Sequence, residues 1–143
     1  VTGSIDNTGT AETTGIEVEA LARWSPRWWL RASYSHAETR AAEPRLVPED
    51  LASVVLNHKR GPWNLNLSTI YHGSYANPNR APAVTMLDSY VLANTHIRYD
   101  LGEAELFATI SNLLDTDYET PLIDEFGAPG RGREWRIGFR LPF

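Results

Sequence analysis

The sequence contains no cysteine, no long apolar run and no excess of basic residues. The absence of Cys from all 143 residues excludes a disulfide framework, a thiolate zinc site and a cysteine nucleophile. No run of about 18 apolar residues occurs, so the sequence predicts no transmembrane helix. A formal net charge of −5 and a pI of about 5.3 argue against a nucleic-acid partner, because nucleic-acid binders carry a basic face.

Enzyme motifs are also absent. The sequence has no Gly-x-Ser-x-Gly, no His-Glu-x-x-His and no phosphate-binding loop. Its four His residues do not follow the spacing of metal ligands. We therefore expect no catalytic residue, no metal site and no cofactor, with Ser–His chemistry inside a small barrel as a remote alternative.

The clearest pattern that is present lies at the end of the chain, in residues 132–143. Every second residue there is apolar or aromatic: Trp135, Ile137, Phe139, Leu141 and Phe143. The residues between them include Glu134, Arg136 and Arg140, and this period of two predicts a strand with one apolar and one polar face. If the apolar face meets lipid, a slip by one residue would bury two Arg side chains at about 2–4 kcal/mol each near the midplane. We expect the odd-numbered apolar residues to point outward from a curved antiparallel sheet, in a strongly specified register.

Six further segments alternate in the same way, and none shows a helical period. Strands are predicted at 15–24, 28–36, 51–58, 63–72, 87–99, 104–111 and in the final segment. The third is the least regular, because Val54, Val55 and Leu56 run together. The predicted fold class is all-β, an antiparallel meander of about seven strands.

The connections between these strands alternate in length. Short turns lie at 25–27, 59–62 and 100–103, and long loops lie at 1–12, 37–50, 73–86 and 112–131. Short periplasmic turns and long extracellular loops are typical of a transmembrane β-barrel. A mean hydropathy of −0.35 agrees with this, because only alternate residues of a barrel wall are apolar. The sequence predicts an antiparallel transmembrane β-barrel.

The aromatic residues support the same arrangement. Four on the apolar faces flank short turns: Trp24, Trp28, Trp63 and Tyr99. Phe143 joins them, while Tyr71 and Trp135 lie near the opposite rim. We expect two aromatic belts at the two membrane interfaces, with the first four residues in one layer.

Two other architectures remain open. A soluble β-sandwich binding module would pack its apolar faces together, with Trp and Tyr as strand formers in its core. A small stand-alone barrel, porin-like or an adhesin, would need 1–12 as an eighth strand, although Gly, Thr, Asn and Asp dominate that segment.

Two stretches carry a resemblance to a known family. Residues 110–118 read ISNLLDTDY, which resembles the signature that precedes the last strand of TonB-dependent outer-membrane receptors, with Leu114 in place of the usual Phe. The matching positions are Asn112, Leu113, Asp115 and Tyr118. Residues 130–143 look like the C-terminal strand of that family, 15–17 (GIE) is similar to an earlier strand opening, and 87–99 to the penultimate hairpin.

The final strand also resembles the signal read by the outer-membrane assembly machinery. Gly138, Leu141 and Phe143 fit Gly-x-x-apolar-x-apolar, whereas Ile137 stands where a polar residue is usual. Pro142 removes a ladder donor, which is tolerable beside the end of a strand.

The resemblance implies a function. Such receptors are barrels of about 22 strands around an N-terminal plug domain. They take up scarce nutrients, most often a ferric siderophore and also cobalamin or sugars, with energy from the TonB complex. We expect residues 1–143 to be the C-terminal portion of such a barrel in a Gram-negative outer membrane, without the plug and without a signal peptide at Val1. Its implied partners are outer-membrane lipid, the plug and remaining strands, TonB through the missing part, the assembly machinery and the ligand.

The polar faces should line the lumen of that barrel. The expected lumenal residues are Glu17, Glu19, Arg23, Arg31, His96, Arg98, Glu105, Glu134, Arg136 and Arg140. His36 and His72 lie near the extracellular rim, where a ligand would arrive, and Asp88 and Tyr90 at the loop end are further candidates for ligand contact. The sequence alone assigns neither the ligand-binding residues nor the ligand.

Overall fold

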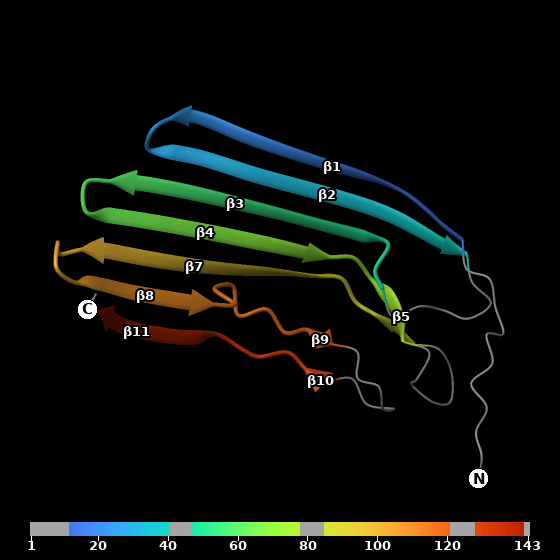
Figure 1. Ribbon diagram of the computed structural model, residues 1–143. Helices are drawn as coiled ribbons and strands as arrows, with labels where there is room; N and C mark the ends of the chain where they lie inside the picture. Colours follow the sequence, from blue (N-terminus) through green and yellow to red (C-terminus); the bar gives the residue numbers. More distant parts are fainter. Residues whose placement is uncertain (1–11, 41–46, 78–84, 121–127, 142–143) are drawn as a thin grey trace, which may run out of the picture.

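The computed structural model describes residues 12–40, 47–77, 85–120 and 128–141, and most of these form one large antiparallel sheet (Figure 1). Its seven strands follow the order β1-β2-β3-β4-β7-β8-β11. Their bounds are β1 Glu12–Ser25, β2 Trp28–Arg40, β3 Asp50–Arg60, β4 Trp63–His72, β7 Tyr90–Asp100, β8 Glu105–Ser111 and β11 Glu134–Arg140. Each pairs with the next, so the predicted meander is confirmed, and β1 and β11 are the two edges of an unclosed sheet.

The strands form where the alternation predicts them, with small differences at their ends. β2 runs to Arg40 and β3 begins at Asp50, so part of the predicted 37–50 loop is strand. The predicted strand 87–99 was wrong at its start, because Asp88 and Ser89 separate β6 (Thr85–Leu87) from β7. The stand-alone barrel alternative depends on residues 1–12, of which 1–11 lie outside the described residues.

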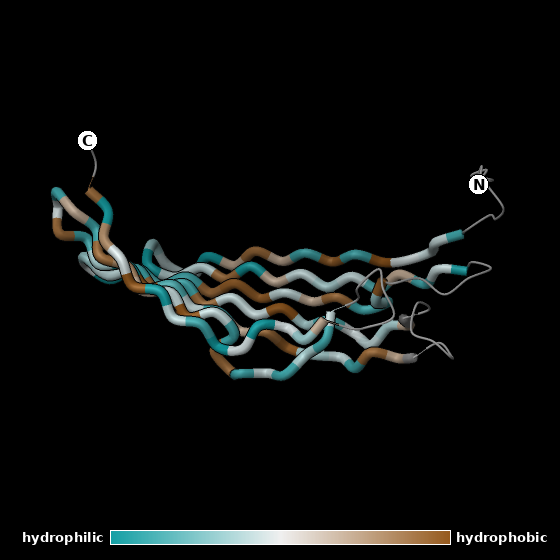
Figure 2. Tube along the Cα trace, turned by 90° about the horizontal axis from the view of Figure 1, so that it is seen from below, coloured by the Kyte–Doolittle hydropathy of each residue, from teal (hydrophilic) through white to brown (hydrophobic). Residues whose placement is uncertain are grey.

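Cross-strand register gives the sheet two distinct faces. Directly opposed residues of an antiparallel pair point to the same side, and Trp63 opposes Tyr99, which opposes Leu106, which opposes Phe139. One side is thus largely apolar, with polar residues such as His36, Asp50 and Arg60 near its two ends, and the other side is largely polar. Figure 2 shows the strands as a single layer, bent at the end that carries the C-terminus.

The apolar face is open rather than packed into a core. The side chains of Trp135, Ile137 and Phe139 are 67%, 82% and 69% exposed. A soluble sandwich would bury these residues against a second sheet, so the sandwich alternative is wrong for the described residues. No described helix is long and apolar enough to cross a membrane.

Two of the three short turns depend on glycine. Gly61 and Gly102 have φ of 56° and 89° in the β3–β4 and β7–β8 turns, a conformation that costs glycine no steric strain. In the second of these turns, the Asp100 carboxylate accepts a hydrogen bond from the Gly102 N–H at 2.8 Å.

The long connections contain structure that periodicity did not predict. β5 (Tyr75–Asn77) pairs with β6, and β9 (Glu119–Thr120) pairs with β10 (Ala128–Pro129). Tyr75 and Leu87 in the first hairpin are buried. Burial raises the pKa of the Tyr75 hydroxyl above its ordinary value, so this side chain stays uncharged. Both hairpins are separate two-stranded sheets that lie at the end opposite the short turns (Figure 1).

Candidate functional site

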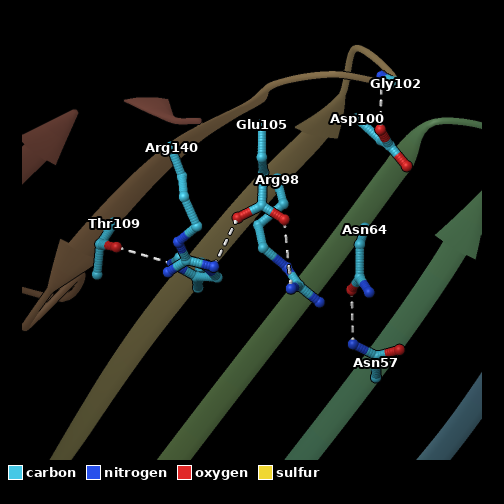
Figure 3. A network of polar contacts seen from close by, with 9 residues as sticks. Asn57, Asn64, Arg98, Asp100, Gly102, Glu105, Thr109 and Arg140 are labelled. Carbon is cyan, nitrogen blue, oxygen red and sulfur yellow. Dashed lines mark hydrogen bonds and ion pairs between the residues drawn. The ribbon is translucent and has the colours of Figure 1, made fainter. Parts of the chain in front are cut away.

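The polar face carries paired charges near the short-turn end. Glu105 lies between two arginines, 3.5 Å from Arg98 Nη1 and 3.4 Å from Arg140 Nη1, which links β7, β8 and β11 (Figure 3). Farther along the sheet, Arg31 donates to Glu19 at 2.7 Å. Register opposes Arg140 to Glu105 directly and sets the other two pairs diagonally on the same face. These predicted lumenal residues therefore join neighbouring strands of the wall.

Further side-chain hydrogen bonds link strands on the same face. Asn57 donates to Asn64 at 2.8 Å between β3 and β4 (Figure 3). His96 Nδ1 lies 2.8 Å from the Thr109 hydroxyl between β7 and β8. The remaining predicted lumenal residues, Glu17, Arg23, Glu134 and Arg136, also lie on the polar face by register.

Asn112, the first residue of the family motif, is the centre of a tight turn after β8. Its side chain is 5% exposed and its φ is 48°, a left-handed conformation that Asn tolerates better than most residues. The side-chain amide donates to the carbonyls of Thr116 and Arg131 at 2.9 and 3.0 Å, and its Oδ1 accepts from the Thr116 N–H at 2.9 Å. This side chain therefore joins the turn to the segment that leads into β11.

The other motif residues complete the turn. The Leu113 N–H donates to the Ala93 carbonyl at 2.6 Å, which fixes the turn to β7. Asp115 has φ of 55°, and its carboxylate accepts from the Arg133 N–H at 2.8 Å. Leu114, in the position where the motif usually has Phe, is exposed. The motif thus sets the path of the chain between β8 and β11.

Tyr118, the last motif residue, belongs to a row of three rings. Its ring centroid lies 4.7 Å from that of Tyr90, which lies 4.9 Å from that of His72 in a stacked arrangement. His72 and Tyr90 are opposed across β4 and β7 and point to the polar face. Gly130 makes room for Tyr118, because a Cβ at Gly130 would overlap the Tyr118 ring. Its N–H also donates to the Tyr118 carbonyl at 2.6 Å.

A pocket of about 460 Å³ opens beside this row at the long-loop end. Its lining comes from β6, the start of β7 and the connection between them, and from the segments that contain β9 and β10. The lining includes Asp88, Tyr90, Asp117, Tyr118, Glu119 and Gly130. Asp88 and Tyr90 were expected to lie where a ligand arrives. Tyr118 was identified only as a motif residue, and no periodic signal links residues 72, 90 and 118, because their proximity arises from strand pairing.

The two predicted rim histidines occupy different faces. His72 lies on the polar face beside the pocket, whereas His36 opposes Asp50 on the apolar face. His36 Nδ1 and the Tyr34 hydroxyl lie 2.9 and 2.6 Å from the same carboxylate oxygen of Asp50. The described residues contain no cluster of His, Asp or Glu with the geometry of a metal site.

The four belt aromatics form two contacting pairs at the short-turn end. The ring centroids of Trp24 and Trp28 are 6.1 Å apart in a stacked arrangement. Those of Trp63 and Tyr99 are 4.6 Å apart and meet edge to face. All four flank short turns on the apolar face, and their role as a membrane-interface belt stays a prediction.

The predicted assembly-signal residues lie in and just after β11. Gly138 of β11 opposes Phe107 of β8, and a Cβ added to Gly138 would lie 2.5 Å from the Phe107 ring. Leu141, just after the strand, is exposed, and Phe143 lies outside the described residues. Packing against Phe107 therefore requires a glycine at this position, independently of any recognition by the assembly machinery.

Comparison with known proteins agrees with this geometry. A family model described as TonB dependent receptor-like, beta-barrel matches residues 1–113. A comparison with curated protein sequences yields no match.

Solved structures share the fold at low sequence identity. The ferripyoverdine receptor of the outer membrane of Pseudomonas aeruginosa, bound to ferripyoverdine, is 20% identical with a TM-score of 0.78, over 92% of this chain and 19% of that chain. The ferric-catecholate import receptor Fiu from E. coli K12, in its open form, is 17% identical with a TM-score of 0.80, over 92% and 21%. The siderophore receptor PiuA from Acinetobacter baumannii is 17% identical with a TM-score of 0.75, over 92% and 22%.

The chain spans about a fifth of the length of these receptors. Receptors of this family are transporters rather than enzymes. The family match covers most of the chain, and the strand pattern, the two faces and the solved structures agree with it. The chain therefore belongs to the TonB-dependent receptor family, as antiparallel wall of its β-barrel.

Proposed function

We propose that this chain is the C-terminal portion of an outer-membrane receptor that takes up a ferric siderophore with energy from TonB. The observation that carries the proposal is the division of one seven-stranded sheet into an apolar face and a polar face that ends in an aromatic pocket. The apolar face suits outer-membrane lipid in a Gram-negative bacterium. The polar face suits the lumen, with a plug domain and further strands supplied by the rest of the receptor.

The ligand assignment draws support from what the similar structures are described as binding or importing. Their descriptions name ferripyoverdine, ferric catecholates and siderophores. In our proposal, His72, Tyr90 and Tyr118 offer ring faces to the organic part of such a complex, because stacked aromatic contacts contribute about 0.5–1.5 kcal/mol beyond area burial.

The charge of the pocket restricts the kind of complex that this wall favours. Asp88 and Asp117 line the pocket, and neither forms an ion pair among the described residues. Two unpaired carboxylates raise the local negative potential and repel an anionic ligand. We therefore propose a ferric complex without net negative charge, such as a ferric hydroxamate, over a ferric tris-catecholate.

Binding of ferric ligands to the purified complete receptor tests this function. Tyr90→Ala is expected to weaken binding of a ferric hydroxamate roughly tenfold, the effect of about 1.4 kcal/mol of lost contact. Gly130→Ala should act in the same direction by displacing Tyr118. Tyr71→Ala is the matched control, because Tyr71 is adjacent to His72 but lies on the apolar face. Equal binding by all four proteins, or no binding of any ferric complex, would contradict the proposal.

A further inference from the structure

The short-turn end of the sheet carries a basic cluster over β1 to β4. The β1–β2 and β3–β4 turns lie side by side, and the Lys59 N–H donates to the Arg27 carbonyl at 2.8 Å (Figure 1). Arg27, Lys59 and Arg60 are all exposed at this point. Two turns that are distant in the sequence thus bring three cations together, although the chain as a whole is acidic.

These cations lack the partners that other arginines of the wall have. Arg31, Arg98 and Arg140 each contact a glutamate on the polar face. Among the described residues, no carboxylate forms an ion pair with Arg27, Lys59 or Arg60. The basic cluster is therefore not neutralised by the wall itself.

Register places part of the cluster on the apolar face, among aromatic rings. Arg60 directly opposes Trp63 across β3 and β4, and both belong to the face that carries Trp28 and His58. The His58 ring stacks on Trp28 with centroids 3.8 Å apart. An arginine side chain that extends from an apolar surface beside an aromatic belt places its guanidinium at the height of the lipid headgroups.

We propose that Arg27 and Arg60, flanked by Trp28, His58 and Trp63, bind the phosphate of an anionic glycerophospholipid in the leaflet next to the short turns. The proposal rests on the proposed function only in taking the apolar face as lipid-exposed. Arginine binds phosphate oxygens with paired N–H donors, and the apolar face beyond the belt accommodates the acyl chains. Lys59, which faces the polar side, adds to the local positive potential.

The neighbouring turn confines this site to one part of the rim. The β7–β8 turn carries Asp100 and Glu103 instead of cations. An anionic headgroup is repelled there and attracted beside β1 to β4, where each cation near a charged lipid surface contributes about fivefold in binding. The lipid is therefore held at a fixed sector of the barrel.

Native mass spectrometry of the complete receptor, titrated in detergent with phosphatidylglycerol or with phosphatidylcholine of the same acyl chains, tests the site. The wild-type receptor is expected to retain phosphatidylglycerol at lower concentration. Arg27→Gln/Arg60→Gln should weaken that binding roughly thirtyfold, since it removes two such cations. The matched control is Arg23→Gln/Arg136→Gln, which removes from the polar face two arginines that form no ion pair with another described residue, and it should leave lipid retention unchanged.

Three results would overturn the lipid site: equal binding of the two lipids, unchanged phosphatidylglycerol binding in the Arg27/Arg60 variant, or an equal loss in the control. Unchanged lipid binding would also be the outcome if the cluster serves a periplasmic protein instead. Lipid selectivity without binding of any ferric siderophore would contradict the proposed ligand and leave the lipid site standing. Siderophore binding without lipid selectivity would contradict the lipid site alone.

Discussion

At the scale of single residues, the family motif acts mainly through backbone geometry. Asn112 and Asp115 both adopt positive φ. The Asn112 side chain also forms three hydrogen bonds to backbone groups, two to carbonyls and one to an N–H. The sequence identified these residues through their resemblance to a motif, but their roles became apparent only in the folded turn. Bonds such as Asn112 to Arg131 join positions whose proximity no local pattern predicts.

Substitution of Asn112 separates its backbone role from its side-chain role. Asn112→Ala removes the hydrogen bonds and places a Cβ residue at positive φ, so it should destabilise the folded barrel by about 1–3 kcal/mol. Asn112→Gly restores the favourable φ and should recover part of this loss. Urea unfolding of the purified receptor measures both. Equal stability of the alanine variant and the wild type would contradict the role of the side chain as a clamp.

The outward position of Ile137 gives a second residue-level prediction. Ile137→Arg places a charge on the face assigned to lipid and should lower the free energy of unfolding in bilayers by about 2–4 kcal/mol if the site lies near the midplane. Ser111→Arg is the control, because Ser111 opposes Glu134 on the polar face and should be tolerated. Comparable losses for both variants would be inconsistent with two distinct faces.

At the scale of elements, alternation predicted all seven strands of the sheet, because each has one apolar side. Even β3 formed as expected, with Val54 and Val55 on opposite faces. The two small hairpins were missed because pairings of two or three residues are too short to show a period. The pocket was missed as a unit for a related reason, since its walls come from β6, β7 and the β9–β10 hairpin.

The final strand also provides a prediction about assembly. We propose that Gly138, Leu141 and Phe143 form the signal that the assembly machinery reads in this chain. Deletion of Phe143 should then reduce the amount of receptor inserted in the outer membrane, whereas Thr120→Ala in the β9–β10 hairpin should not. Quantitative immunoblotting of membrane fractions measures this, and normal insertion of the truncated receptor would refute the signal.

At the scale of the whole molecule, the two faces of the sheet unite the observations. Charged pairs brace the polar face, the pocket opens at its long-loop end, and aromatic pairs line the short-turn end of the apolar face. Edge strands β1 and β11 have no further partner within the described residues, and the solved receptors are about five times as long. These facts together support the proposal that the sheet is part of the wall of a larger barrel.

The most direct measurement of this central claim is a spin-label scan of β11 in the complete receptor in lipid bilayers. Residues 1–143 contain no Cys, so single labels at 134, 135, 136, 137, 139 and 140 report on this strand without native thiols from these residues. Labels at 135, 137 and 139 should collide preferentially with oxygen, which partitions into lipid. Labels at 134, 136 and 140 should collide preferentially with a water-soluble nickel chelate. A reversed pattern, or no alternation along the strand, would contradict the assignment of the two faces.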